Sequence, residues 1–359
     1  MKGADALGVR SERLVEGLIE RNLDCLLVSD LINVRYLTGF TGTNGACVVT
    51  PGERLFLTDF RYTEQAETQV QGFELLPAGR DLVGDLAGRL SGRAGFDDAH
   101  MSVRTHAKLT EKVATAVELV AAGGAVEDLR QVKDAQEVAA IREAQELATA
   151  ALERTLERGL VGRTERAVAL DLEREMREAG AEDPSFPSIV AAGPHGALPH
   201  AEPRDATIGS NTLVVIDWGA RVDGYCSDCT RTFATGPLDD EAAATYELVR
   251  RAQAQALSSV RAGAAGRAVD AVARDLITEA GHGEHFGHGL GHGVGLEVHE
   301  EPRLTKTAEG ELGAGNVVSV EPGVYLPGRF GVRIEDLVAV TDGGADVLTS
   351  FPKELVTIG

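Results

Sequence analysis

Residues 213–233 read LVVIDWGARVDGYCSDCTRTF. The apolar run 213–218 and the run 225–233 flank the turn-forming pair Asp223-Gly224, which is the pattern of two strands joined by a tight turn. Residues 317–340, VVSVEPGVYLPGRFGVRIEDLVAV, have the same plan, with apolar runs at 317–320 and 332–340 on either side of Gly328. Each stretch therefore predicts a hairpin whose strands are mostly buried.

The first predicted hairpin carries two carboxylates, Asp217 and Asp228. If its turn centres between Val222 and Asp223, the two lie directly opposite each other. Opposed residues on antiparallel strands point to one face, with Cβ atoms about 5 Å apart. Carboxylates that close repel each other strongly unless a cation lies between them.

The second predicted hairpin places Glu321 and Glu335 in the same way about Gly328, and Pro322-Gly323 should end regular pairing there. The chain has 56 acidic residues, so a solvated strand face explains either pair alone at least as well as a metal site does. However, Asp217 and Glu321 both end markedly apolar strands, and charges that adjoin buried strands need partners.

Histidines supply further candidate ligands. Seven of the nine lie between His195 and His299, and residues 287–295, GHGLGHGVG, alternate glycine with other residues. Glycine at this density lets the backbone approach a ligand closely. A phosphate-binding loop is the main alternative, but the GxGxxG pattern and a following Walker lysine are absent. One imidazole among four carboxylates favours manganese or cobalt, or zinc in a two-ion site. We interpret Cys226 and Cys229 as packing residues.

The length of 359 residues favours two domains. The first third alternates helical and strand patterns, with a helix around 13–21, a strand at 25–28, a turn-rich segment at 33–42, and strands at 46–49 and 55–58. Gly123-Gly124 and the polar residues after it indicate a boundary between domains 1–126 and 127–359. The predicted fold class is α/β (α+β).

The second domain contains one pattern twice. Helices over 135–158 and after Thr164 precede the first hairpin, and helices beginning after Asp239 and covering 269–277 precede the second. Gly180 and Gly281 should end the second helix of each pair. This repetition predicts two related halves whose hairpins face each other across one site. Because helix–helix–hairpin is a common order of elements, chance similarity is the alternative explanation.

Charge and composition exclude several classes of partner. The formal net charge of −21 disfavours nucleic acid and anionic membrane surfaces, and the 4% content of aromatic residues disfavours a base-stacking platform. We find no apolar run long enough to cross a bilayer and no signal peptide in residues 1–10. Four scattered cysteines predict free thiols in a reducing compartment, so we expect a cytoplasmic protein.

Five motifs occur in order: IDWG at 216–219, DCTRT at 228–232, HGLGHG at 288–293, EPG at 321–323 and RIED at 333–336. Together they resemble the proline-specific branch of the pita-bread metallopeptidases, aminopeptidase P and prolidase. The resemblance covers essentially the whole chain, because residues 33–42 and 58–62 resemble the amino-terminal, creatinase-like domain of that branch. It implies a small α/β domain followed by a pita-bread catalytic domain with internal duplication.

The resemblance also implies a two-metal site. Asp217 would bind one metal alone, Asp228 and Glu335 would bridge both, and His292 and Glu321 would bind the second. Two divalent ions, manganese first and cobalt or zinc as alternatives, would activate a water for attack on the carbonyl carbon. Glu321 would in addition be the general base.

Further roles follow from the same resemblance. His299 would hydrogen-bond the reacting carbonyl, His200 and His288 would line the substrate pocket, and Arg333 would brace the metal ligands. The expected catalytic residues are therefore Glu321, His299 and His200, and the expected substrate-binding residues are His288, Arg303, Arg333 and Tyr325.

The expected reaction is hydrolysis of the Xaa-Pro bond in short peptides by a dipeptidase (prolidase), with Arg303 at the substrate carboxylate. An aminopeptidase P acting on longer peptides can carry arginine there too, and an inactive binding protein on the same fold is a further alternative. Methionine aminopeptidase lacks the amino-terminal domain, and creatinase lacks the metal ligands. We expect a homodimer in which the amino-terminal domain limits substrate length through Tyr36, Arg61 or Tyr62.

Overall fold

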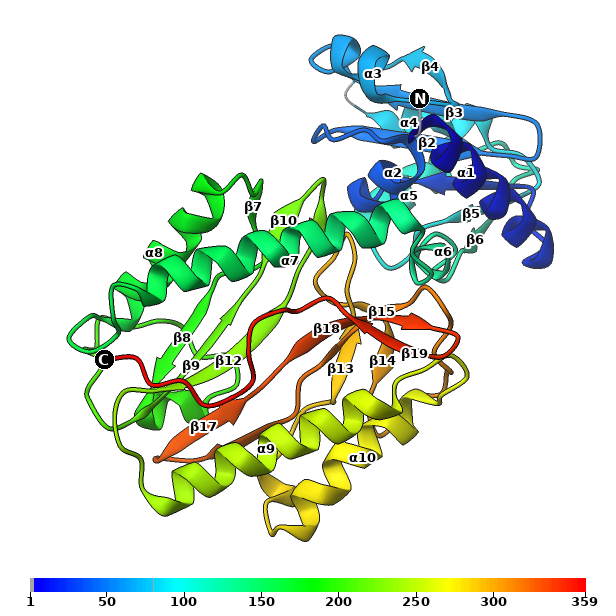
Figure 1. The fold of residues 1–359 in the computed structure, drawn as a ribbon. Helices are drawn as coiled ribbons and strands as arrows, with labels where there is room; N and C mark the ends of the chain where they lie inside the picture. Colours follow the sequence, from blue (N-terminus) through cyan, green and yellow to red (C-terminus); the bar gives the residue numbers. More distant parts are fainter. Residues whose placement is uncertain (1–2, 80) are drawn as a thin grey trace. The chain divides into compact units, whose positions relative to one another are not determined.

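The computed structural model describes residues 3–79 and 81–359, and the chain divides into two compact units, Met1–Arg130 and Gln131–Gly359 (Figure 1). The boundary expected at 126/127 lies just before this division. The helical turn α6 (Glu127–Arg130) stays with the first unit because it is bound there through Asn33. The Asn33 amide donates to Glu127 at 2.6 Å and accepts from Arg130 at 2.9 Å.

The first unit is built on one six-stranded mixed sheet with the strand order β4-β3-β2-β1-β5-β6. The predicted strands at 25–28, 46–49 and 55–58 are confirmed. The strands are β1 (Cys25–Val28), β2 (Gly45–Val49), β3 (Arg54–Thr58), β4 (Glu74–Pro77), β5 (Arg93–Phe96) and β6 (Glu118–Ala121). The helices before α6 are α1 (Gly3–Glu20), α2 (Leu31–Thr38), α3 (Thr63–Gln69), α4 (Leu82–Leu86), η1 (Ala87–Arg89) and α5 (Val103–Lys112).

Helix α2 corrects the expectation of a turn-rich segment at 33–42. Asp30 caps this helix, because its carboxylate accepts from the Asn33 backbone N–H at 2.9 Å. Gly39 ends it in the left-handed region at φ 80°. The turn residues of the sequence therefore mark the end of a short helix, and tertiary packing of Val34 and Leu37, both fully buried, outweighs weak helix propensity.

The second unit contains the duplicated pattern. Helices α7 (Ala135–Leu156) and α8 (Glu165–Glu178) lie on one side of the strands, and α9 (Asp240–Ser259) and α10 (Gly266–Glu279) lie on the other (Figure 1). Thr164 and Asp239 cap α8 and α9, as predicted, by accepting from backbone N–H groups at 3.1 and 2.7 Å. Gly180 and Gly281 follow α8 and α10 at positive φ, also as predicted.

The strands of this unit form several small sheets. Two sheets belong to the first half, with the orders β12-β9-β8 and β11-β10-β7, and two to the second, with the orders β14-β13-β15-β18-β19 and β16-β17. The bounds in the first half are β7 (Asp183–Pro184), β8 (Ile189–Ala192), η2 (Gly193–Ala197), β9 (Leu213–Trp218), β10 (Ala220–Val222), β11 (Tyr225–Cys226) and β12 (Cys229–Ala234). Those in the second are η3 (Gly283–His285), β13 (Gly291–Gly293), β14 (Glu300–Leu304), β15 (Val317–Val320), β16 (Gly323–Leu326), β17 (Phe330–Arg333), β18 (Asp336–Thr341) and β19 (Gly344–Val347).

The register of the first hairpin differs from the expectation. Val222 pairs with Tyr225, so the turn consists of Asp223 and Gly224, and Asp217 pairs with Thr230 instead of Asp228. Both turn residues have positive φ, as a two-residue hairpin turn requires. Because the register moves by two residues, Asp228 keeps the same face as Thr230 and lies diagonally across from Asp217.

The register of the second hairpin agrees with the expectation. Val320 pairs with Asp336 and Gly323 pairs with Arg333, so Glu321 and Glu335 take opposite places in the gap between these pairs. Regular pairing stops at Pro322, as predicted, because proline has no N–H to donate. Asp228 lies in a similar gap between β11 and β12. Three of the four carboxylates therefore lie where the ladders are interrupted.

Separate cores hold the two halves of the second unit. Trp218 is fully buried in the first core, where its indole N–H donates to the Ala148 carbonyl at 2.8 Å.

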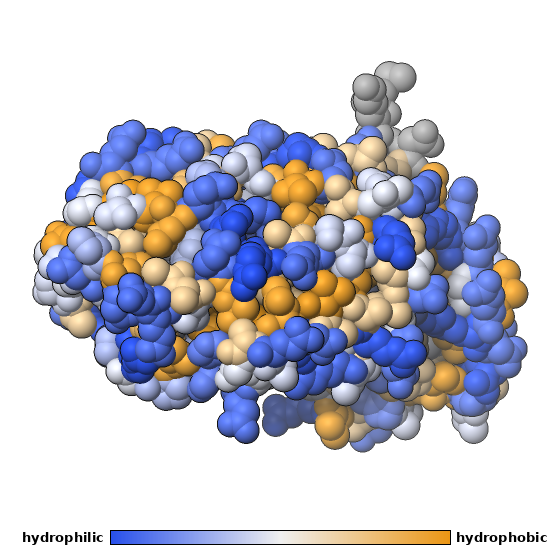
Figure 2. All heavy atoms as spheres, turned by 60° about the horizontal axis from the view of Figure 1, so that its bottom comes forward, coloured by the Kyte–Doolittle hydropathy of each residue, from blue (hydrophilic) through white to orange (hydrophobic). Residues whose placement is uncertain are grey.

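Hydrophilic residues cover much of the face shown in Figure 2. In the part of the chain that the structure describes, no helix has both the length and the apolarity needed to cross a bilayer.

Candidate metal centre

Side chains from both halves of the second unit converge where the strand ladders are interrupted. The Nε2 atom of His292 lies 3.1 Å from Glu321 Oε1 and 3.7 Å from Asp228 Oδ2. Asp228, His292 and Glu335 each offer one ligand atom, and these three atoms lie within 4.8 Å of one another. All three residues are buried. The sequence-predicted ligands thus come together, with Asp217 joined to the group through Arg333.

The backbone fixes this cluster from two directions. The Glu335 N–H donates to the Thr230 carbonyl at 3.0 Å, which ties the second hairpin to the first. The Thr230 hydroxyl donates to Glu335 Oε2 at 2.8 Å. The Glu321 N–H donates to the Leu290 carbonyl at 2.8 Å, which places Glu321 beside the histidine-bearing strand β13. The first half therefore positions Glu335 of the second, and the second half positions its own Glu321.

The glycines around His292 serve the packing of strands. A Cβ atom at Gly291 would overlap the Ser319 carbonyl, and one at Gly293 would overlap the Glu301 carbonyl. Only glycine lets β13 pass this closely between β15 and β14. The sequence pattern predicts that the backbone approaches a ligand closely here. In the structure, the glycines instead allow neighbouring strands to approach each other closely.

The orientation of His292 directs its Nε2 atom towards the carboxylates. The ring Nδ1 lies 3.1 Å from the Gly293 carbonyl oxygen, which can only accept a hydrogen bond. Nδ1 is therefore protonated, and Nε2 is the ring atom that faces Glu321 and Asp228. Without a cation Nε2–H donates to Glu321, and with a cation bound Nε2 would offer its lone pair, which is the usual arrangement of a metal-binding histidine.

The pKa values of the carboxylates also indicate that the cluster needs a cation. Burial, followed by the charges of neighbouring carboxylates, raises the pKa of Asp228 and that of Glu335 well above their ordinary values. Burial also raises the pKa of Asp217, although Arg333 opposes this effect. Asp217 Oδ1 and Glu335 Oε1 are buried and accept no hydrogen bond from any described residue. Oxygen atoms without donors in a buried acidic cluster fit a bound divalent cation.

Glu321 differs from the other three carboxylates. Burial acts to raise its pKa, but the hydrogen bond and charge of His292 outweigh burial and lower the pKa of Glu321 to about 2. The Ser319 hydroxyl also donates to Glu321 Oε1 at 3.2 Å. Glu321 is therefore an ionised acceptor at neutral pH, so any role as a general base depends on its position and not on a raised pKa.

His299 lies against His292, with ring centroids 4.3 Å apart. Its partial burial, together with the neighbouring His292, lowers the pKa of His299 to about 4. The ring is therefore neutral at pH 7 and can donate one N–H into the site. Burial also lowers the pKa of His288.

Arg333 connects Asp217 to the segment that carries His200. Its guanidinium donates to Asp217 Oδ2 at 2.6 Å, to the Thr230 hydroxyl at 2.9 Å and to the Pro199 carbonyl at 3.0 Å. It also donates to the Tyr325 hydroxyl at 2.8 Å. Arg333 is 3% exposed, so it braces Asp217 and the Pro199 segment at once.

Tyr325 lies behind the cavity wall. Burial raises the pKa of Tyr325 to about 12, so its neutral hydroxyl can donate to His288 Nε2 at 3.0 Å. Tyr325 is not among the residues that line the cavity, whereas His288 and Arg333 are. The expected contact between Tyr325 and substrate stays a prediction, and the contacts in the structure are those of a support for His288.

A cavity of about 440 Å³ opens over the cluster, within the range of small-molecule sites. His200, His299 and Arg303 line it, as the resemblance implied. Sequence reasoning missed several lining residues, which are Phe186, Pro187, Ile189, Glu202 and Thr305. They carry no motif, and only Glu202 and Thr305, which lie two residues from His200 and Arg303, could have been indicated by their place beside predicted site residues.

A buried carboxylate holds the segment that carries His200. Glu165, at the start of α8, is 1% exposed and accepts from the Ala192 N–H at 3.0 Å and from the Arg204 N–H at 3.1 Å. His195 Nδ1 lies 2.9 Å from the same carboxylate. Both ends of the segment 192–204 are therefore attached to one side chain, and Arg333 holds its middle at Pro199.

Cys226 and Cys229 are free, buried thiols. Burial raises the pKa of Cys229 well above its ordinary value and raises that of Cys226 to about 11. A neutral thiol is a poor metal ligand. Cys229 Sγ lies 3.5 Å from the Glu335 backbone carbonyl, so it packs behind the cluster, in agreement with the packing role expected from the sequence.

Comparison with known proteins assigns this architecture to a class. Residues 139–342 match the model of metallopeptidase family M24, and residues 10–132 match that of the creatinase/prolidase N-terminal domain. The chain belongs to metallopeptidase family M24 and carries the amino-terminal domain shared by creatinases and prolidases.

Particular relatives span the full length of the chain. An uncharacterised peptidase of Bacillus subtilis, YqhT, is 40% identical over 98% of this chain and 100% of its own length. The structure of an Xaa-Pro dipeptidase from Bacillus anthracis matches with a TM-score of 0.94 and 38% identity, over 98% of this chain and 99% of that one. An X-Pro aminopeptidase from Thermotoga maritima matches with a TM-score of 0.89 and 34% identity, over 97% and 99%.

Proposed function

We propose that this protein is a metal-dependent peptidase that hydrolyses the Xaa-Pro bond, acting as an Xaa-Pro dipeptidase. The observation that carries the proposal is the buried cluster of four carboxylates and one imidazole, with unpartnered oxygens, at the floor of a cavity of about 440 Å³. The M24 family and the full-length match to an Xaa-Pro dipeptidase support it.

Two divalent cations are the proposed cofactor, with manganese first and cobalt or zinc as alternatives. The residues that would hold them are Asp217, Asp228, His292, Glu321 and Glu335. An oxygen-rich set with one imidazole suits these ions. When bound, such a pair lowers the pKa of water and polarises the substrate carbonyl.

The chain's own residues then have distinct tasks. His299, neutral at pH 7, donates an N–H to the developing oxyanion. Glu321 accepts a proton from the attacking water and returns it to the nitrogen of the leaving proline. His200, held over the cavity by the Glu165 and Arg333 attachments, completes the catalytic set as a hydrogen-bond partner of the substrate.

The cavity wall supports a preference for proline. An Xaa-Pro bond has no N–H, so a site for it needs no acceptor at that place. Phe186, Pro187 and Ile189 offer apolar surface to a ring, and His288, fixed by Tyr325, lines the same cavity. Packing a ring against such a wall contributes about 1–2 kcal/mol.

Arg303 supports a dipeptide as substrate. It lines the cavity, and its guanidinium contacts only Glu301, at 3.4 Å, among the described residues. A partly exposed guanidinium can bind the free carboxylate of proline in a two-residue substrate. Because Arg303 is partly exposed, a peptide substrate longer than two residues also fits beside it. An Xaa-Pro aminopeptidase is therefore the second candidate.

A chelation assay tests the proposal. Hydrolysis of Met-Pro should disappear after exhaustive chelation and return on addition of manganese. The tripeptide Met-Pro-Ala should be cleaved with a kcat/KM at least tenfold lower if the protein is a dipeptidase. Equal rates on both peptides would favour the aminopeptidase, and metal-independent hydrolysis would contradict the proposal.

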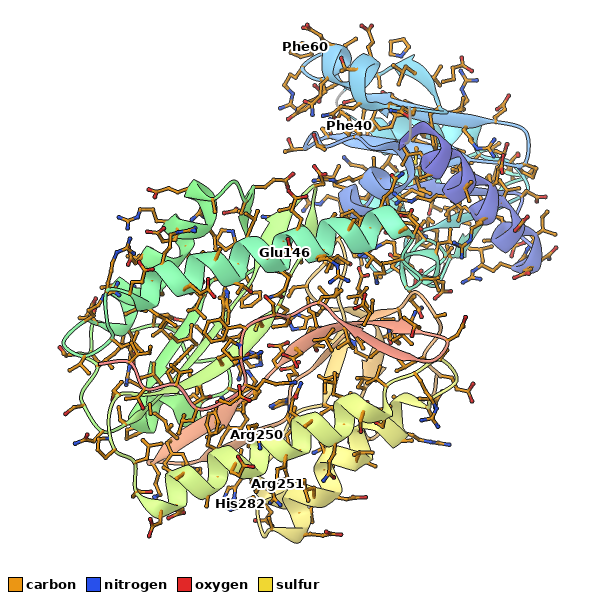
Figure 3. The ribbon with its side chains drawn as sticks, in the orientation of Figure 1. Phe40, Phe60, Glu146, Arg250, Arg251 and His282 are labelled. Atoms are coloured by element: carbon orange, nitrogen blue, oxygen red, sulfur yellow. The ribbon has the colours of Figure 1, made fainter. Side chains whose placement is uncertain are left out.

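We further propose a cytoplasmic homodimer that acts on short proline-containing peptides. The four free cysteines suit a reducing compartment. Within the first unit, Phe60 is 76% exposed beside Arg61, which is paired with Asp59 (Figure 3). An exposed aromatic side chain next to a fixed cation is typical of a contact surface. Tyr36 is 2% exposed under Arg10, so Arg61 and Tyr62 are the better candidates for limiting substrate length.

A further inference from the structure

We propose that Glu202 is a specificity-determining residue that favours substrates with a basic side chain, lysine or arginine, immediately before proline. The inference rests on the proposed Xaa-Pro peptidase function and names a substrate class within it. Its starting point is that Glu202 lines the cavity and is exposed to solvent. It is therefore a carboxylate of the cavity that lies outside the buried cluster.

The charge of Glu202 is not balanced by a neighbouring cation. Among the described residues, its side chain forms no ion pair and no hydrogen bond. Arg204, the nearest cation along the chain, is committed to Glu165 by hydrogen bonds from Nε at 3.1 Å and from Nη2 at 3.2 Å. Arg303, a partly exposed cation that lines the cavity, contacts Glu301 instead. A cationic substrate group can thus pair with Glu202 without first displacing a partner.

The position of Glu202 selects the substrate's side chain over its amino terminus. The α-nitrogen lies about 2.5 Å from the carbonyl carbon of the same residue. When that carbonyl is at the reaction centre, the α-nitrogen lies at the buried cluster, whose Asp217 and Asp228 are 9% and 5% exposed. Glu202 is exposed and does not belong to that cluster, so a longer group, such as the side chain of lysine or arginine, is the part of the substrate suited to pair with it.

The segment that carries Glu202 is held in place before substrate binds. Glu165 binds the backbone N–H groups of Ala192 and Arg204, and Arg333 binds the Pro199 carbonyl. Pro203 restricts the backbone directly after Glu202. The backbone at Glu202 is therefore already ordered, so pairing with a substrate cation costs the conformational entropy of the Glu202 side chain but not that of its loop.

The test compares two substrates of similar length, Lys-Pro and norleucyl-proline, with the full-length, manganese-loaded protein. The measured quantity is the ratio of their kcat/KM values. We expect this ratio to fall roughly three- to tenfold in Glu202→Gln, as for a partly exposed ion pair, and to fall further in Glu202→Lys. High salt should lower the ratio of the wild type towards that of Glu202→Gln.

Glu309→Gln is the matched control, because Glu309 is exposed in the same unit, loses the same charge and does not line the cavity. It should leave the ratio unchanged. An unchanged ratio in both Glu202 variants, or an equal loss on both substrates, would overturn the inference. Failure of the wild type to cleave either substrate would instead contradict the proposed function, and the inference with it.

Discussion

At the scale of single residues, the site is defined by charges that the protein alone leaves unbalanced. Asp228 and Glu335 are buried near each other and near Asp217, and among the described residues Arg333 is the arginine that pairs with a carboxylate of the cluster. The unpartnered oxygens of Asp217 and Glu335 show that hydrogen bonds do not compensate for this burial. The arrangement is therefore costly to stability unless a cation occupies it.

Substitution of one ligand should separate stability from activity. Asp228→Asn removes one of the repelling charges, so we expect the metal-free variant to unfold a few degrees above the metal-free wild type. The same change should lower kcat/KM by more than about 100-fold, because it removes a ligand and not merely a supporting group. Differential scanning calorimetry with and without manganese, together with Met-Pro hydrolysis, measures both effects.

A metal-free variant that is less stable than the wild type would show that the carboxylates are not in electrostatic conflict. Thr307→Val, a change at an exposed residue outside the cavity lining, serves as a control for handling and metal removal. It should alter neither the unfolding temperature nor the activity appreciably.

At the scale of elements, the interrupted strands position the carboxylates of the cluster, and the buried Glu165 positions the segment 192–204. The predicted strands at 213–218 and 317–320 are confirmed. Apolar runs of this length need burial on both faces, which a central strand provides. The pairing of Asp217 with Thr230 was not expected, because the exact turn residues depend on the local backbone of Asp223 and Gly224. The helix at 31–38 was also missed, since its stability comes from packing and from the Asp30 cap.

The Glu165 attachment should matter for turnover more than for substrate affinity. Glu165→Gln removes the charge that holds Arg204 and presents an amide to groups that donate. We expect kcat for Met-Pro to fall roughly tenfold or more with a smaller change in KM, because a misplacement of about 1 Å in a catalytic group can cost two orders of magnitude. Steady-state kinetics give the two parameters.

Glu146→Gln is the control for this change, since Glu146 is exposed on the neighbouring helix α7 (Figure 3). It should leave kcat and KM unchanged. If Glu165→Gln lowered only the unfolding temperature and left kcat intact, the segment 192–204 would have no positioning role for His200.

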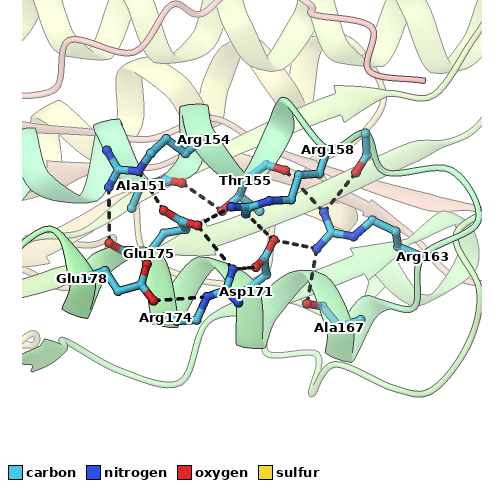
Figure 4. Close-up of polar contacts among 11 residues, drawn as sticks. Ala151, Arg154, Thr155, Arg158, Arg163, Ala167, Asp171, Arg174, Glu175 and Glu178 are labelled. Carbon is cyan, nitrogen blue, oxygen red and sulfur yellow. Dashed lines mark hydrogen bonds and ion pairs between the residues drawn. The ribbon is translucent and has the colours of Figure 1, made fainter.

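Helices α7 and α8 are joined by a network of ion pairs (Figure 4). Arg158 and Arg154 lower the pKa of Glu175 to about 2, and Arg154 Nε lies 2.8 Å from its carboxylate. A lowered pKa in the folded state contributes stability above the unfolded value of about 4.5 that is lost as the pH falls towards 2. Glu175→Gln should therefore be less stable than the wild type at pH 7, with the difference shrinking at pH 3.

Urea unfolding at the two pH values measures this difference. Glu178→Gln is the comparison, because Glu178 lies in the same helix with a side chain that is 64% exposed and a single long contact to Arg174. A difference for Glu175→Gln that stays constant between pH 7 and pH 3 would contradict the assigned pKa.

At the scale of the whole molecule, the two-unit plan and the duplicated halves could be predicted, but the cavity could not. Motifs identified the residues of the buried cluster, because ligands need fixed chemical types at fixed spacings. Phe186, Glu202 and Thr305 line the cavity from loops and edges that no periodicity marks. Their role depends on how segments far apart in sequence approach each other, which becomes visible only in three dimensions.

The proposed dimer is tested at this scale. Phe60→Ser replaces an exposed aromatic side chain in the first unit with a polar one, so the fold should persist. If Phe60 lies in a subunit contact, the variant should dissociate at protein concentrations at which the wild type is dimeric, as measured by multi-angle light scattering. An unchanged mass for the variant, or a monomeric wild type, would contradict the assignment.

The proposed function requires that divalent cations bind to five side chains together, which are Asp217, Asp228, His292, Glu321 and Glu335. Anomalous diffraction from crystals soaked in manganese tests it most directly. We predict two strong peaks among these five side chains, with the second weakened or lost in Asp228→Asn. Crystals that show no anomalous peak within bonding distance of these side chains, at saturating manganese, would contradict it.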